Sequence, residues 1–135
     1  MQCAADEALA EALVRAVAAL RDGVVLFGMG EIEPKIAAEN RVGYVREGYV
    51  DLNYNNAGNL VLERSKGAWD PEDVATRAVR LATLAQVGTI EGDTLPLAIE
   101  TICIHGDAPN SAEIARRVRE RLEEAGVEIV PIGAR

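Results

Sequence analysis

The sequence predicts an α/β fold in which helices pack on a mostly parallel sheet. Apolar runs of strand length alternate along the chain with segments whose apolar residues recur at helical spacing. Turn residues such as Gly23, Gly58 and Gly126 separate these segments. Strands that alternate with helices typically form parallel sheets that the helices cover.

The first part of the chain contains two helical patterns and one strand pattern. A helix is predicted over residues 6–22, and a buried strand over residues 24–27 that ends in the turn Gly28-Met29-Gly30. Pro34 suits a first helical turn, so a short helix is expected from Pro34 to Glu39.

The central part begins with another strand pattern. Residues 42–50 are apolar enough for a strand, residues 55–59 have turn chemistry, and residues 60–62 are expected to return as a short strand. A helix should then start at Asp70 as its cap and Pro71 in its first turn, and it is expected to stop at Gly88.

The last part repeats the alternation of strand and helix. A strand is predicted over residues 99–104 and a final strand over residues 127–131. Between them lies a helix that ends at Gly126. Asn110 stands at its cap position, and Glu113 follows at capping-box spacing.

Composition predicts a single domain that spans residues 1–135. The 22 acidic and 14 basic residues give a net charge of −8, so we expect no nucleic-acid partner. No apolar run approaches membrane-spanning length and no signal peptide is evident, which predicts a cytoplasmic protein without membrane contact. Cys3 and Cys103 lie far apart and are expected to be free thiols.

The strongest candidate site is His105-Gly106-Asp107, which follows the strand predicted at 99–104. His105 is the only histidine, and it lies where the ligands and catalytic groups of α/β proteins gather. Asp107 could orient its ring or hold a cation, or it could be a turn residue. Asp51 directly follows the strand predicted at 42–50. Its carboxylate could therefore lie at the same strand-end site as His105, or it could be a solvated loop residue.

Two other features give weaker signals. The Gly28-Met29-Gly30 turn resembles a phosphate-binding loop but lacks a third glycine and a strong following helix. One histidine without a cluster of cysteines predicts that no metal site is built from this chain alone.

Residues 102–109, Ile-Cys-Ile-His-Gly-Asp-Ala-Pro, resemble the I-C-V-H-G-D-T-P signature of the LamB/YcsF family, the A subunit of prokaryotic 5-oxoprolinase. Asp51, Tyr54, Gly58 and the Leu60-Val61 pair follow the same family's upstream pattern in order. The family's amino-terminal motifs D-L-N-C-D-x-G-E and K-P-H-G-A-L-Y do not occur in this sequence. The chain therefore resembles the carboxyl-terminal half of that family.

The resemblance implies a partial (β/α)-barrel-like domain. It also implies hydrolysis of 5-oxo-L-proline to L-glutamate coupled to ATP hydrolysis, with ATP as cofactor and the 5-oxoprolinase subunits B and C as partners. His105, Asp107 and Asp51 would be the catalytic residues. The chain would need a separate amino-terminal half or self-association, and we expect it to be inactive alone.

Two alternatives remain open at this point. Leu52 and Glu63 stand where the family has arginines, which favours a non-catalytic half-barrel remnant or an oligomeric binding module. An unrelated α/β domain that binds a nucleotide through Gly28 and Gly30 is the other alternative.

Overall fold

The computed structural model describes residues 6–20, 23–64 and 67–133, which form an α/β fold of two compact units. The first unit comprises the chain up to Gly48 together with residues 99–101. The second comprises residues 49–98 and the chain from Ile102 onward. Each unit is described by itself. The expectation of a single domain stays a prediction.

The first unit packs two helices, α1 (Glu7–Ala18) and α2 (Glu33–Glu39), against each other. Asp6 caps α1, since its Oδ1 accepts a hydrogen bond from the N–H of Leu9 at 3.1 Å. The core of this unit is made of small and branched apolar side chains. Its buried members are Ala10, Val14, Ile36, Ala37 and Val42.

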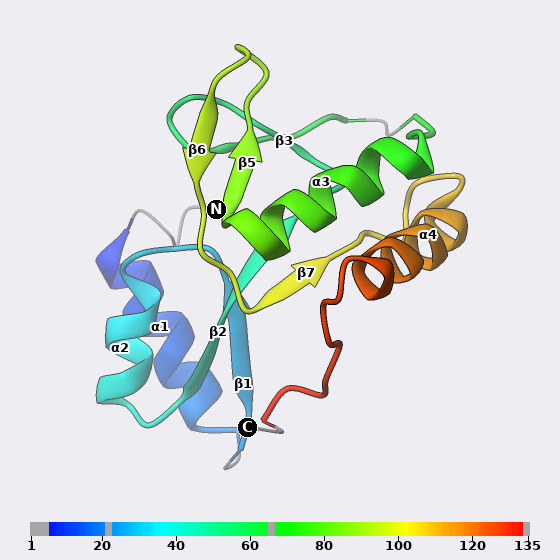
Figure 1. Cartoon of the computed structure of the whole chain (residues 1–135). Coiled ribbons are helices and arrows are strands. Elements are labelled where there is room, and N and C mark those ends of the chain that lie inside the picture. Colours follow the sequence, from blue (N-terminus) through cyan, green and yellow to red (C-terminus); the bar gives the residue numbers. More distant parts are fainter. Residues whose placement is uncertain (1–5, 21–22, 65–66, 134–135) are drawn as a thin grey trace. The chain divides into compact units, whose positions relative to one another are not determined.

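The parallel sheet starts in this unit. Strand β1 (Val25–Gly28) pairs in parallel with β2 (Gly43–Tyr49), and Val25 lies opposite Gly43 (Figure 1). Strand β7 (Thr101–Cys103) begins at the last residue of this unit and continues into the second. The predicted α/β fold with a parallel sheet is confirmed by the β1–β2 pair. A barrel stays a prediction.

A buried carboxylate and a tyrosine hydroxyl meet at the end of β1. The Glu33 side chain is only 7% exposed, and its Oε2 accepts a hydrogen bond from Tyr44 Oη at 3.3 Å. Burial raises the pKa of Tyr44 to about 12, and the charge of Glu33 contributes to the rise. A Cβ atom on Gly28 would lie 2.6 Å from this hydroxyl, so the contact requires glycine there.

The second unit is built on α3 (Pro71–Leu84) and α4 (Ser111–Glu124), which pack side by side (Figure 1). Asp70 caps α3, since its Oδ1 accepts a hydrogen bond from the N–H of Glu72 at 2.8 Å. The predicted inner stripes of both helices are buried. Their buried members are Val74, Ala78, Leu81, Ile114, Val118 and Leu122.

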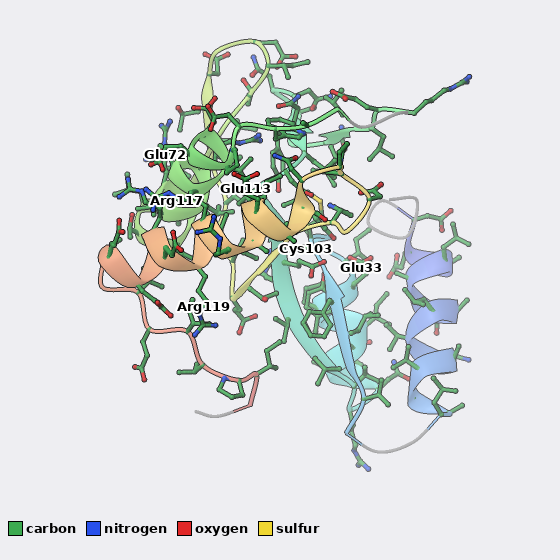
Figure 2. The ribbon with its side chains drawn as sticks, turned by 90° about the vertical axis from the view of Figure 1, so that its right-hand side faces the viewer. Glu33, Glu72, Cys103, Glu113, Arg117 and Arg119 are labelled. Atoms are coloured by element: carbon green, nitrogen blue, oxygen red, sulfur yellow. The ribbon has the colours of Figure 1, made fainter. Side chains whose placement is uncertain are left out.

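An acidic side chain joins the two helices at their edge. Glu72 of α3 pairs with Arg117 of α4 at 2.6 Å and with Arg121 at 2.9 Å. Figure 2 shows Glu72 and Arg117 on facing sides of the two helices. These pairs are partly exposed, so they add less to stability than the apolar stripe beneath them.

Two short antiparallel pairs complete the second unit: β3 (Asn53–Tyr54) with β4 (Leu60–Val61), and β5 (Gln86–Gly88) with β6 (Thr94–Pro96). In each pair a short turn joins the strands, which is possible only for antiparallel neighbours. These two antiparallel hairpins are separate from the sheet that contains the parallel β1–β2 pair.

Several predicted boundaries were wrong. Helix α1 ends at Ala18, although Gly23 has a positive φ of +79°, as expected for a residue that follows a helix. Helix α3 ends at Leu84, because Ala85 adopts the left-handed conformation and Gly88 belongs to β5. The predicted final strand at 127–131 is irregular backbone.

Asn110 was also predicted to cap α4 with its side chain, and it does not. Its Nδ2 instead donates a hydrogen bond to the carbonyl oxygen of Trp69 at 2.8 Å. The amide therefore ties the start of α4 to the loop that precedes α3.

Gly28→Ala should lower the free energy of unfolding by about 1–3 kcal/mol, because the new Cβ forces the Tyr44 hydroxyl away from Glu33. Adding Tyr44→Phe removes the clashing oxygen and should restore part of the loss. Gly88→Ala is the control, since nothing lies within 4 Å of its added Cβ. Urea denaturation measures all four proteins. Equal stabilities of Gly28→Ala and Gly88→Ala would contradict the role of the close contact.

Candidate functional site

The site is organised around the carboxylate of Asp51, which follows β2 at the start of the second unit. The Asp51 residue is only 1% exposed. A carboxylate removed from water in this way needs hydrogen-bond donors, because an unpaired buried charge is strongly unfavourable. The structure supplies these donors from a residue 54 positions away.

That residue is His105, which follows β7. Its backbone N–H donates a hydrogen bond to Asp51 Oδ2 at 2.7 Å. Its ring Nδ1 lies 2.9 Å from Oδ1 and 3.1 Å from Oδ2 of the same carboxylate. An ionised carboxylate can only accept hydrogen bonds, so this geometry places the proton of the neutral ring on Nδ1. Nε2 is then the nitrogen that can accept a proton.

Two tyrosines support the pair. The ring of Tyr49 stacks on the imidazole of His105, with ring centroids 5.7 Å apart and an interplanar angle of 23°. The backbone N–H of Tyr49 donates to Tyr54 Oη at 2.9 Å. Tyr54 is 1% exposed, and this burial raises the pKa of its phenol. Sequence reasoning did not assign either tyrosine a role, although both lie within three residues of Asp51.

Of the predicted site residues, the structure brings Asp51 and His105 together, so Asp51 is not the solvated loop residue that was its alternative interpretation. Asp107 is exposed in the turn that follows His105. The carboxylate of Asp51 contacts the ring directly and is in position to orient it. The catalytic roles of His105, Asp107 and Asp51 stay predictions.

A small cavity lies beside Asp51. Its volume is about 10 Å³, which is room for about one water molecule. The cavity is lined by Asp51, Leu52, Asn53, Val61, Glu63 and Trp69. Leu52 is 6% exposed, so its apolar side chain belongs to the core of the second unit.

The Gly28-Met29-Gly30 turn does not have the features of a phosphate-binding loop. The space beside Gly28 is filled by the hydroxyl of Tyr44, and α2 begins with an acidic residue, Glu33. A carboxylate in the first turn of a helix would repel a phosphate there. The glycine is explained by packing alone.

Side chains that could bind metals are dispersed over the described ranges. No group of three or more His, Cys, Asp or Glu side chains that could hold a metal ion is found in residues 6–20, 23–64 and 67–133. Cys103 is a half-buried cysteine in β7, while Cys3 lies outside the described residues. Among the helices described, none is long and apolar enough to cross a membrane.

The arrangement of Asp51 and His105 is suited to proton transfer. A buried carboxylate that fixes the tautomer and orientation of an imidazole is the arrangement that lets Nε2 act as a general base and then as a general acid. The side chain of His105 is 33% exposed, whereas that of Asp51 is 1% exposed. A substrate group could therefore reach the ring but not the carboxylate.

Asp51→Ala should lower the free energy of unfolding by about 1.5–3 kcal/mol, because it leaves two donors of His105 without their acceptor. In a double-mutant cycle with His105→Ala, the coupling energy should be about 0.5–3 kcal/mol. Glu128→Ala, which removes an exposed carboxylate, should change stability by less than about 0.5 kcal/mol. A coupling energy of zero would show that the ring contact is absent in solution.

Comparisons with known proteins identify relatives of the whole chain. The chain is 35% identical over 130 residues to a 5-oxoprolinase A subunit of Pseudomonas aeruginosa, covering 96% of this chain and 52% of the relative. It is 36% identical over 127 residues to the 5-oxoprolinase A subunit of Thermus thermophilus, covering 92% of this chain and 51% of that relative. The chain thus spans about half the length of these curated relatives.

A solved structure gives the same result. The crystal structure of a lactam utilization protein from Thermus thermophilus matches with a TM-score of 0.76 at 33% identity. The match covers 92% of this chain and 50% of that chain. The model of the LamB/YcsF family matches residues 1–135. The chain therefore belongs to the LamB/YcsF family.

Proposed function

We propose that this chain contributes the proton-transfer site of an ATP-dependent 5-oxoprolinase, which opens 5-oxo-L-proline to L-glutamate. The observation that carries the proposal is the Asp51–His105 pair, in a chain whose relatives are named as A subunits of 5-oxoprolinase. The name of the related lactam utilization protein points to the same kind of bond, a cyclic amide.

The reaction requires protons to be moved at two atoms. Opening the lactam breaks the bond between the carbonyl carbon and the ring nitrogen, and a water oxygen becomes bonded to that carbon. One proton must leave the water and one must reach the departing nitrogen. Nε2 of His105 can accept the first and deliver the second, while Asp51 keeps the ring in place throughout.

ATP, when bound, would supply the free energy of its own hydrolysis to the opening of a stable lactam. The site residues described above do not include a phosphate-binding loop, since Tyr44 fills the space beside Gly28. Asp107 remains a candidate catalytic residue in this proposal, because it is exposed two residues after His105.

The proposal includes partners. Because the chain spans about half of its relatives, the active enzyme would also contain the part of the fold that corresponds to their other half. The 5-oxoprolinase subunits B and C would complete the complex, and the whole would work in the cytoplasm.

One observation favours a different function. Leu52, which stands where the family resemblance led us to expect an arginine, is buried in the core and offers no charge to a substrate. A non-catalytic half-barrel that serves as a binding or oligomerisation module would tolerate this leucine. The two functions differ in whether His105 affects turnover.

The test replaces the matched segment of the Pseudomonas aeruginosa relative with this chain and adds that organism's other 5-oxoprolinase subunits. L-Glutamate and ADP released from 5-oxo-L-proline and ATP are then measured. His105→Ala should lower kcat about 10²–10⁴-fold, the usual contribution of a general acid–base. Arg119→Ala on α4, which removes an exposed ion pair with Glu123, should leave kcat unchanged.

Two results would contradict the proposal. If the chimera folds but neither it nor any of its variants forms L-glutamate, the non-catalytic module is favoured. Full turnover in His105→Ala would show that the enzyme does not use this imidazole.

A further inference from the structure

A second cavity lies in the second unit, between α3 and β5. Its volume is about 310 Å³, at the lower end of the range for small-molecule sites. Most of the residues that line it are polar or basic. They are Asn53, Thr76, Arg77, Arg80, Gln86 and Thr89. No aspartate or glutamate is among the described residues that line this cavity.

The side chain of Arg77 makes two contacts at one wall of the cavity. Its guanidinium donates a hydrogen bond to the carbonyl oxygen of Leu52 and lies over the ring of Trp69, 4.9 Å from the ring centroid. The side chain is half-buried, and burial lowers the pKa of its guanidinium. The negative charges of Asp51 and Asp73 act in the opposite direction and favour the charged form.

Arg80 lies three positions further along α3, so it occupies the same side of the helix as Arg77. Its guanidinium donates to Thr94 Oγ1 at 2.9 Å and to Gln86 Oε1 at 3.3 Å. Both acceptors are neutral, as is the carbonyl oxygen that accepts from Arg77. These hydrogen bonds orient the two guanidinium groups without neutralising them.

The arginines of α4 behave differently. Arg116, Arg117, Arg119 and Arg121 each form an ion pair with a glutamate at 2.6–2.9 Å. Carboxylates are thus abundant in a chain with 22 acidic residues, yet the hydrogen-bond acceptors described for Arg77 and Arg80 are neutral. The two guanidinium groups therefore line a cavity that contains no acidic side chain among its described lining residues.

We propose that this cavity binds the oxyanion group, a carboxylate or phosphate, of a small ligand. Guanidinium groups bind such oxyanions through paired N–H donors. Arg77 is preorganised by its stacking on Trp69, and the amide of Asn53 and the hydroxyl of Thr76 supply further donors. The proposal stands on this cavity and does not require 5-oxoprolinase activity.

The cavity is close to the candidate catalytic pair along the chain. Asn53 lines both this cavity and the small one beside Asp51. Arg77 bonds to the carbonyl of Leu52, the residue next to Asp51. A ligand held by Arg77 would therefore be bound against the segment that carries Asp51.

The test titrates the full chain, labelled with ¹⁵N, with inorganic phosphate, ADP, L-glutamate and 5-oxo-L-proline in separate arms. The amide signals of Gly88 and Thr89 and the Nε–H signal of Arg77 should shift with saturation for at least one probe. Phosphate and ADP alone would identify a phosphate site, and the other two alone a carboxylate site. Isothermal titration calorimetry then measures Kd.

Arg80→Ala is the decisive variant, because Arg80 is exposed and its loss should leave the fold intact. It should raise Kd at least tenfold, while Arg119→Ala, which removes the same charge from α4, should change Kd less than twofold. Thermal unfolding verifies that both variants are folded. Absence of saturable shifts with all four probes at millimolar concentration, or an equal effect of the two variants, would overturn the proposal.

Discussion

The arrangement of the site depends on one buried charge. The Asp51 carboxylate accepts hydrogen bonds from both the backbone and the ring of His105, so a single side chain fixes the path of one loop and the orientation of its imidazole. Burying a carboxylate is unfavourable unless donors compensate, so the loss of either donor would destabilise the buried charge. The same contact therefore couples local stability to the geometry required for proton transfer.

The tyrosines extend this constraint to further residues of the second unit. Tyr49 stacks on the imidazole and is itself held through its backbone by the buried hydroxyl of Tyr54. Tyr54 belongs to β3, and its backbone carbonyl accepts a hydrogen bond from the N–H of Ile90 at 2.9 Å. The imidazole is thus supported by a chain of contacts that leads to the β5–β6 hairpin, whose residues also line the cavity that contains Arg77 and Arg80.

Those parts of the fold that rest on local chemistry could be predicted from the sequence. Asp70 and Pro71 start α3 as expected, and the turn at residues 55–59 forms with Gly58 at a φ of +77°. Features that depend on contacts between residues far apart in the sequence could not be predicted in this way. Residues 127–131 have the composition of a strand but pair with no strand among the described residues. The side chain of Asn110 does not cap α4 and instead donates a hydrogen bond to the carbonyl oxygen of Trp69, in another loop.

The site shows the same division. The ends of apolar runs predicted Asp51 and His105, because strand ends are where polar groups gather. Sequence proximity made Asp107 a candidate partner of the ring, and only the tertiary structure shows that Asp51, 54 positions away from His105, contacts it. Arg77 and Arg80 carry a weaker signal, two arginines one helical turn apart, and only the structure shows that they line one cavity and donate to neutral acceptors.

The tautomer of His105 tests the central claim most directly. His105 is the only histidine, so ¹⁵N-histidine labelling gives a single imidazole whose two nitrogens can be assigned by long-range ¹H–¹⁵N correlation. In the neutral ring the proton should reside on Nδ1, and Asp51→Asn should weaken this preference. A neutral ring protonated on Nε2, or a tautomer indifferent to residue 51, would contradict the account.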